Sequence, residues 1–161
     1  MSHSESVRNY LDALGARTPA PASGSGAAVA GAIAAALAEL AGRFSDEREI
    51  VSRLVELRTR LLELGDEDAA AYTDFMRTKS DADRERTIDV PLAIAENAAE
   101  VARLAKTLVE GGNPRVAGDA EAGYILAGAV AAVGARLVEI NLSGSADPRL
   151  ERARAAVTAA S

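Results

Sequence analysis

The side chains best suited to chemistry in this sequence are carboxylates, because it contains no cysteine and a single histidine at position 3. That composition excludes thiolate catalysis, disulfides and thiolate metal sites, and it leaves too few imidazoles for a histidine-based metal centre. Among the acids, Asp68 stands directly before the apolar residues 69–72, and Asp119 stands where an apolar helix should begin. A carboxylate beside an apolar surface is partly desolvated, and it can then act as a base or bind a cation.

Each carboxylate also has a plain structural interpretation. Asp68 closes the acidic run of residues 66–68, a pattern typical of a solvated helix face. Asp119 fits a helix N-cap or a first-turn acid that the helix dipole favours. From the residues alone, both interpretations of each acid stay open.

A loop rich in Pro, Gly and Ser is the second candidate for function. Residues 18–26 read TPAPASGSG and lead directly into an Ala-rich stretch. Free N–H groups at a helix start can receive an anion or a carbonyl, which makes Gly24 and Ser25 candidate ligand-binding residues. A plain Ser N-cap on a buried helix explains the same residues equally well, and the Gly-Lys-Ser/Thr of a P-loop does not follow.

Two asparagines complete the set of candidate binding residues. Asn113 follows a glycine pair, and Asn141 stands at the end of a long apolar run. A buried amide needs hydrogen-bond partners, and a bound ligand is one source of them. The alternative is that Asn141 is an ordinary residue at the end of a helix.

The elements that must position these residues are predicted to be helices. Aromatic residues make up only 3% of the chain and alanine supplies much of its apolar content, which favours helix over strand. Apolar residues recur every three or four positions, which predicts helices. Gly65 is a candidate kink or break, residues 78–85 are a loop or a frayed end, and Pro91 fits the first turn of a helix. The predicted helices cover about residues 4–16, 25–44, 46–76, 91–111, 118–142 and 147–157.

This pattern predicts one all-α domain over residues 1–161, an up-and-down helical bundle with two central Ala-rich helices. An alanine core buries little apolar area per residue, so we expect a homodimer to supply part of the stability. The two Ala-rich stretches, residues 26–42 and 122–138, are near the lower length limit for a membrane span. Because Glu39 and Arg136 interrupt them, we interpret them as buried helices of a protein that does not enter the membrane.

Charge and the N-terminal residues bound the class of protein further. The formal net charge is −6, which argues against a nucleic-acid-binding protein. Residues 1–10 are polar and lack the apolar segment of a signal peptide, so we expect a cytoplasmic protein.

The motifs, in their order along the chain, resemble those of the cyclodeaminase/cyclohydrolase family of folate enzymes. Residues 19–28 read PAPASGSGAA, similar to the family's Pro-x-Pro-Gly-Gly-Gly-Ser-x-Ala-Ala. Residues 68–72 read DAAAY, similar to Asp-Ala-x-Ala-Tyr/Phe. The segments Val90-Pro91-Leu92, Gly112-Asn113, Asp119 and Ile140-Asn141-Leu142 follow in the family's order, so that the resemblance covers nearly the whole chain.

The resemblance implies a dimeric all-α bundle that binds a tetrahydrofolate derivative in a groove near the subunit interface, with no metal and no cofactor beyond that substrate. The implied reaction is either hydrolysis of 5,10-methenyltetrahydrofolate to 10-formyltetrahydrofolate or cyclisation of 5-formiminotetrahydrofolate with release of ammonia. Asp68 and Asp119 would then be the catalytic acids and bases. Gly24, Ser25, Asn113 and, less directly, Asn141 would position the folate.

Two departures from the family pattern keep a second function open. Ala22 and Ser23 replace two of the three glycines in the loop, and a Cβ there could block a ligand that passes close to the backbone. Leu137 stands where the family often has another asparagine. The alternative is therefore a non-catalytic or retasked member of the family, a helical dimer that binds folate or docks to another protein.

Overall fold

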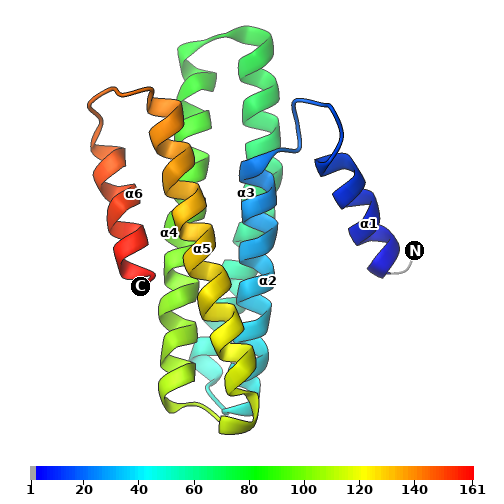
Figure 1. The fold of residues 1–161 in the computed structure, drawn as a ribbon, viewed down its shortest axis with the longest axis vertical. Helices are drawn as coiled ribbons and strands as arrows, with labels where there is room; N and C mark the ends of the chain where they lie inside the picture. The colour runs from blue at the N-terminus through cyan, green and yellow to red at the C-terminus, as the bar shows by residue number, and fades with distance from the viewer. Residues whose placement is uncertain (1–2) are drawn as a thin grey trace.

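The computed structural model describes residues 3–161, with side chains from Ser6 onward, so the side chain of His3 lies outside the described part. Its long helices alternate in direction and form the predicted all-α, up-and-down bundle (Figure 1). The elements are α1 (His3–Leu14), α2 (Ser23–Phe44), α3 (Arg48–Thr78), α4 (Asp81–Gly111), a 3-10 turn η1 (Pro114–Val116), α5 (Ala117–Leu142) and α6 (Pro148–Ala159).

The core combines alanines from α2 with leucines from α3. Ala28, Ala35 and Ala38 are completely buried on α2. Opposite them, the leucines at positions 54, 57, 61 and 64 repeat every three or four residues and are almost completely buried. Small side chains let the helix axes approach closely, and the leucines fill the space that remains.

Helices α4 and α5 are in close contact at Gly134. A Cβ at this position would lie 2.9 Å from the Cβ and N atoms of Ala95 and 2.9 Å from the carbonyl oxygen of Pro91. Two of these atoms belong to the backbone of α4, so the contact cannot relax by a side-chain rotation alone. The absence of a side chain at Gly134 therefore sets the spacing between the two helices.

Gly134→Ala should consequently destabilise the protein. We expect the free energy of unfolding to fall by about 1–3 kcal/mol, the usual cost of overpacking a tight core contact. Gly111→Ala is the matched control, because a Cβ at Gly111 would meet no atom within 4 Å. Thermal melts followed by circular dichroism compare the two variants, and equal melting temperatures would contradict the assigned contact.

Helix α4 begins ten residues before Pro91, so the prediction of a loop at residues 78–85 was wrong over most of its length. The Ser80 side chain caps the helix by accepting a hydrogen bond from the N–H of Asp83 at 3.2 Å. Asp81 and Asp83 both lie in the first turn, where the helix dipole favours acids. The charged composition of this segment thus belongs to the solvated start of a helix. Gly65, predicted as a candidate kink or break, lies inside the uninterrupted α3.

Pro91 therefore lies inside α4, where it has no N–H to donate to the carbonyl of Thr87 one turn earlier. The Asn141 side chain replaces that donor. Its Nδ2 atom donates to the carbonyl oxygen of Thr87 across a distance of 2.6 Å. One function of Asn141 is thus structural, since it joins the end of α5 to the interrupted turn of α4.

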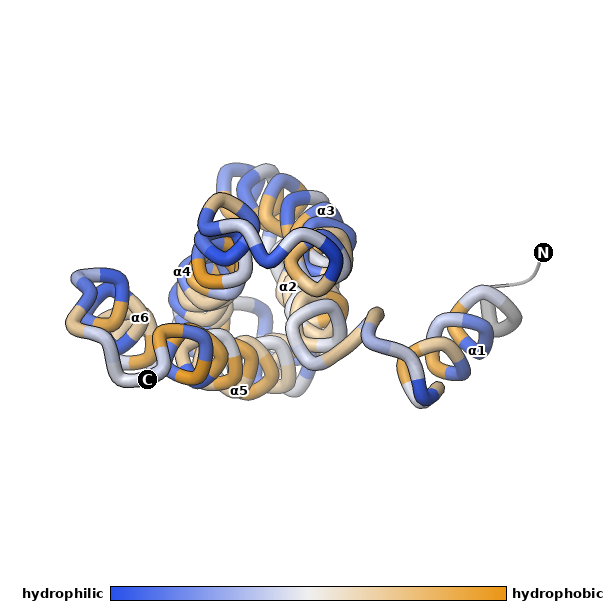
Figure 2. The backbone as a smooth tube through the Cα atoms, turned by 90° about the horizontal axis from the view of Figure 1, so that it is seen from above, coloured by the Kyte–Doolittle hydropathy of each residue, from blue (hydrophilic) through white to orange (hydrophobic). Residues whose placement is uncertain are grey.

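Two helices, α1 and α5, expose apolar residues to solvent. Helix α1 stands beside the bundle, next to α2 (Figure 2). Its apolar residues Val7 and Leu11 are 57% and 56% exposed. The outer face of α5 is also uncovered, and only 33% of its most apolar window is buried. By length and composition alone, α2 and the segment Pro114–Leu142 are apolar enough to cross a membrane, a test that core helices of soluble proteins also pass.

Candidate functional site

A cavity of about 320 Å³ opens at one end of the bundle. This end contains the N-terminal parts of α2 and α4 and the C-terminal parts of α3 and α5. It collects residues from four helices and from the loop that precedes α2. The lining residues are Pro19, Ala22, Ser23, Gly24, Asp68, Tyr72, Thr87, Pro91, Leu137, Ile140 and Asn141.

Asp68 is the acid in this cavity, and it lies against the first turn of α2. Its Oδ2 atom accepts a hydrogen bond from the backbone N–H of Ser25 at 3.0 Å. The N-cap residue of α2 is Ala22, whose side chain cannot accept such a bond. Asp68 on α3 therefore performs for α2 the capping function that a local Ser or Asp performs in other helices, and it ties the two helices together at the site.

Gly24 is the residue that makes this contact sterically possible. A Cβ at Gly24 would lie 2.2 Å from Oδ1 and 2.4 Å from Cγ of Asp68, distances that real carbon atoms do not reach. The backbone of α2 and the carboxylate of α3 are thus in direct contact. The prediction of a functional glycine at this position has a physical basis, namely the room that it leaves for Asp68.

Ala22 and Ser23 do not need to be glycine. Ala22 has φ −137° and ψ −156°, an extended conformation that any residue adopts, and Ser23 is the first residue of α2. Both residues line the cavity, so their side chains reduce its size without straining the backbone. The loss of two glycines from the loop is accommodated by the fold.

The surroundings of Asp68 shift its pKa upwards. Burial penalises the ionised form and raises the pKa above the usual 3.8, while the hydrogen bond from Ser25 acts in the opposite direction and is the smaller effect. A carboxyl with a raised pKa gives up and takes back a proton more readily near neutral pH than an exposed aspartate does. This is the property that a general acid and base requires.

The raised pKa also predicts how the stability changes with pH. The folded state binds the Asp68 proton more tightly than the unfolded state does, so this group contributes stability below pH 3.8 that is lost as the pH rises through its folded-state pKa. Asp68→Asn keeps an acceptor for Ser25 and removes the ionisation. We expect the melting temperature of the variant to rise relative to wild type between about pH 4 and pH 7, by a few degrees at most. A difference in melting temperature that is independent of pH would contradict the shift.

Ser25 connects the site to α1. Its side chain is almost completely buried, at 4% exposed, and its Oγ atom lies 3.1 Å from the hydroxyl of Tyr10. The same residue thus touches Asp68 through its backbone and α1 through its side chain. The sequence motif identified Ser25 as a candidate, but Tyr10 had no signal beyond its place in the apolar spacing of the first helix.

The structure brings together four of the six predicted site residues. Gly24, Asp68 and Asn141 line the cavity, and Ser25 lies immediately beneath it. Asp119 and Asn113 lie at the opposite end of the bundle. Asp119 is in the first turn of α5 and Asn141 in the last, so the two are about 33 Å apart at a rise of 1.5 Å per residue. Within one chain, Asp68 and Asp119 therefore do not form a pair.

Asn113 has a structural role at its own end of the bundle. Its Nδ2 atom donates to the carbonyl of Phe44 at 2.9 Å, and its backbone N–H donates to the Ser45 hydroxyl at 2.9 Å. Its Oδ1 atom caps η1 by accepting from the N–H of Arg115 at 3.0 Å. Asn113 thus joins the turn after α2 to the turn before α5.

Tyr72 belongs to the DAAAY motif, but sequence reasoning did not identify it as a site residue. It follows Asp68 by four positions on α3, so that the two side chains share one face of the helix. It lines the cavity and remains 41% exposed, which leaves its ring available to a ligand. Among the described residues, no group of three or more His, Asp or Glu side chains is placed to hold a metal ion.

Comparisons with known proteins place the whole chain in a family. Residues 6–159 match the family model described as formiminotransferase-cyclodeaminase. The crystal structure of formiminotetrahydrofolate cyclodeaminase from Thermotoga maritima superposes with a TM-score of 0.86 and 25% sequence identity, covering 99% of this chain and 91% of that one. No curated protein sequence gives a significant match. Because the family model covers nearly all of the chain, this protein belongs to the formiminotransferase-cyclodeaminase family.

Proposed function

We propose that the protein is a folate one-carbon enzyme that cyclises 5-formiminotetrahydrofolate to 5,10-methenyltetrahydrofolate with release of ammonia. The observation that carries this proposal is the Asp68 carboxyl, with a raised pKa, at the first turn of α2 in a cavity built from the family's own motifs. Membership of the family and the likeness to the Thermotoga maritima formiminotetrahydrofolate cyclodeaminase support the choice of substrate.

One carboxyl can perform the proton transfers of this reaction. In the protonated formimino group, the carbon attached to N5 is the electrophile, and N10 of the folate attacks it to form the new ring bond. The proton that N10 loses passes to the Asp68 carboxylate. Asp68 then gives that proton to the amino nitrogen, whose bond to the carbon breaks so that ammonia leaves and the methenyl cation remains.

The rest of the cavity would bind and orient the folate. The apolar residues Pro91, Leu137 and Ile140 offer a surface to a flat ring, and Tyr72 offers an aromatic face next to Asp68. The polar side chains of Thr87 and Asn141 are engaged in hydrogen bonds within the protein. The Thr87 hydroxyl donates to the carbonyl of Arg84, and the Asn141 amide donates to the carbonyl of Thr87. Within this chain, Asp68 is therefore the acid–base group of the cavity.

Hydrolysis of 5,10-methenyltetrahydrofolate is the second candidate reaction. A single acid–base group, Asp68, is enough for this reaction as it is for the cyclisation. Water attacks the methenyl carbon and loses a proton to Asp68. The bond from that carbon to N5 then breaks, N5 takes up the proton that Asp68 holds, and the new hydroxyl loses its own proton as the C=O bond forms, which gives 10-formyltetrahydrofolate. A net proton is released to solvent, so the step needs a base but no group to expel ammonia.

We also propose that the protein acts as a cytoplasmic homodimer and needs neither a metal nor a redox cofactor. The uncovered apolar face of α5 supports the dimer, since a monomer would leave that face in water. The proton transfers above need only a side chain of this chain and the folate.

The near-ultraviolet absorbance of the methenyl group tests both reactions. Purified protein given 5-formiminotetrahydrofolate should make the absorbance rise, and protein given methenyltetrahydrofolate should make it fall if hydrolysis is the reaction. If neither rate exceeds that of buffer, the protein is the non-catalytic or retasked relative. A rise in melting temperature with added folate would then identify a binding protein, because a ligand stabilises the state that it binds.

A further inference from the structure

We propose that the tip of the α3–α4 hairpin is a subsite for the glutamate tail of the folate. In this subsite Arg84 and Lys79 pair with the two carboxylates of the glutamate, and Phe75 contacts the aminobenzoyl ring that precedes them. The inference rests on the proposed function for the identity of the ligand. It supplies a group that recognises the tail, since the residues that line the Asp68 cavity include no cation.

The hairpin extends past the mouth of the cavity. The paired ends of α3 and α4 project beyond the start of α2 and the end of α5 (Figure 1). The side of the hairpin that elsewhere packs against α2 and α5 is therefore uncovered at the tip. The ion pair between Arg86 and Asp74, at 3.0 Å, places residue 84 of α4 beside about residue 76 of α3. By the same register, Pro91 lies close to the level of Asp68, and both line the cavity.

Arg84 lies on the side of α4 that lines the cavity. It precedes Thr87 by three positions and Pro91 by seven, spacings that keep all three residues on one side of the helix. Further along α4 this side is buried core, at Ala95 and Ala98, whereas Arg84 is exposed. The rise along the helix from residue 91 to residue 84 is about 10 Å. An aminobenzoyl group with its amide bond spans a similar distance, so a folate that reacts beside Asp68 brings its glutamate to the level of Arg84.

Helix α3 contributes the aromatic ring and the second cation. Phe75 follows Asp68 by seven positions and Lys79 follows it by eleven, so both lie on the cavity side of α3. Phe75 is half-buried, and the Nζ atom of Lys79 lies 5.0 Å from the centre of its ring. The ammonium group is thus held near the level of Arg84. A ring with cations beside it suits the aromatic amide of the tail and the carboxylates that follow.

Neither of these two cations has an acid partner within the described part of the chain. The Lys79 ammonium donates to the sulfur of Met76 at 3.2 Å, which is a weak acceptor. Away from the cavity side, by contrast, Arg77 pairs with Asp74 at 3.0 Å, and Arg86 pairs with the acids at positions 74 and 83. The hairpin therefore neutralises its outer cations itself and leaves those on the cavity side available to a ligand.

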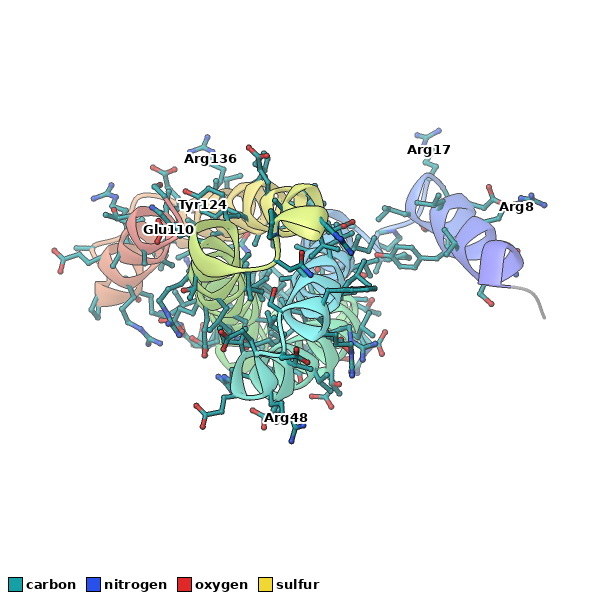
Figure 3. All side chains as sticks on the ribbon, turned by 90° about the horizontal axis from the view of Figure 1, so that it is seen from below. Arg8, Arg17, Arg48, Glu110, Tyr124 and Arg136 are labelled. Carbon is teal, nitrogen blue, oxygen red and sulfur yellow. The ribbon has the colours of Figure 1, made fainter. Side chains whose placement is uncertain are left out.

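The other cations near this end of the bundle point elsewhere or are already paired. Arg17, in the loop before α2, points away from the bundle, and Arg136 points outward from α5 (Figure 3). Arg136 also forms an ion pair with Glu139 of the same helix. Arg149 forms ion pairs with the acids at positions 85, 89 and 147. Arg84 and Lys79 are thus the cations best placed to meet carboxylates that project from the cavity.

A pair of stable ligands tests the subsite without any turnover. One is 5-formyltetrahydrofolate, which has a formyl group where the proposed substrate has a formimino group. The other is its diamide, in which both carboxylates of the glutamate are neutral. Isothermal titration calorimetry of the wild type should give a Kd about tenfold lower for the charged ligand, the effect of two partly exposed charge pairs. This preference should shrink as salt is added, because exposed ion pairs are screened.

Substitution of the two cations should remove the preference. Arg84→Gln and Lys79→Gln should each reduce it to about threefold, and the double variant should abolish it. The Kd of the diamide should stay the same in all three variants, because that ligand has no charge to lose at the subsite. A purely structural role of either residue would instead weaken both ligands alike.

Arg77→Gln is the matched control. It removes the same charge from the same hairpin, but Arg77 follows Asp68 by nine positions and therefore lies on the opposite side of α3. Its side chain is 71% exposed. This variant should keep the tenfold preference of the wild type. An equal loss of preference in Arg77→Gln and Arg84→Gln would show that only the net charge of the hairpin matters, and it would overturn the subsite.

The wild-type result separates this inference from the proposed function. Equal Kd values for the two ligands, or no binding of either, would overturn the subsite. A preference for the charged tail in a protein that turns over neither folate substrate would overturn the proposed reaction and leave the subsite in place. Turnover without any preference would do the reverse.

Discussion

Asp68→Asn should lower the turnover of the folate substrate by about 10²–10⁴-fold, the usual contribution of a positioned general acid or base. The substitution keeps the size of the side chain and an oxygen that can accept the hydrogen bond from the N–H of Ser25. It removes the negative charge of the carboxylate and the ability to take up and return a proton. The Michaelis constant should therefore change much less than kcat, which initial rates over a range of substrate concentrations will show.

A matched control separates chemistry from charge. Asp66→Asn removes a carboxylate of the same acidic run, two residues earlier on α3, from an exposed position outside the Asp68 cavity. This variant should retain wild-type kcat. If Asp66→Asn and Asp68→Asn lose activity to the same extent, the acidic run acts through its overall charge and Asp68 is not the proton carrier.

Gly24→Ala should reduce kcat by about 10²-fold, because a displacement of about 1 Å at a catalytic group has an effect of that size. The added Cβ would lie 2.2 Å from Oδ1 of Asp68, so the carboxylate must move away from the first turn of α2. That movement breaks the hydrogen bond from Ser25 as well. Kinetics of the purified variant measure the loss, and circular dichroism confirms that the helices are intact.

Gly26→Ala, two residues along the same helix, is the control for the added methyl group. Its Cβ would meet Leu14 at 3.4 Å, an ordinary contact with the end of a flexible side chain. Alanine is also a better helix former than glycine, so this variant should be active and at least as stable as wild type. Wild-type activity in Gly24→Ala would show that the contact between α2 and Asp68 is not needed for catalysis.

The helices could be predicted because their signals are local. The leucine spacing on α3, the alanines of α2 and the cap at Asp147 each identify their element without reference to the rest of the chain. The start of α4 could not be predicted in this way. Proline is commonest in the first turn of a helix, but here Pro91 is fully buried three turns into α4, and a side chain from α5 compensates for its missing N–H.

The candidate site was only partly accessible from sequence. The motif resemblance pointed to Gly24, Asp68 and Asn141, which line one cavity although more than forty positions separate each from the next along the chain. It could not show that Asp119 and Asn113 lie at the other end of the bundle, because a motif records order along the chain and not direction in space. Nor could it show that α5, which is apolar over most of its length, would pack against α2, α4 and α6 and still leave an apolar face exposed.

Because of the hydrogen bond from Asn141 to Thr87, the helical structure of the first third of α4 depends on the docking of α5. Until α5 docks, the carbonyl of Thr87 has no hydrogen-bond donor, because Pro91 has no N–H and the amide of Asn141 is not yet in place. The segment from Asp81 to Pro91 should then fray, and the wall that it gives to the cavity should be lost with it. In hydrogen exchange, the amides of this segment should exchange at the same rate as those at the end of α5. The two segments would then form one cooperative unit, distinct from the part of α4 that follows Pro91.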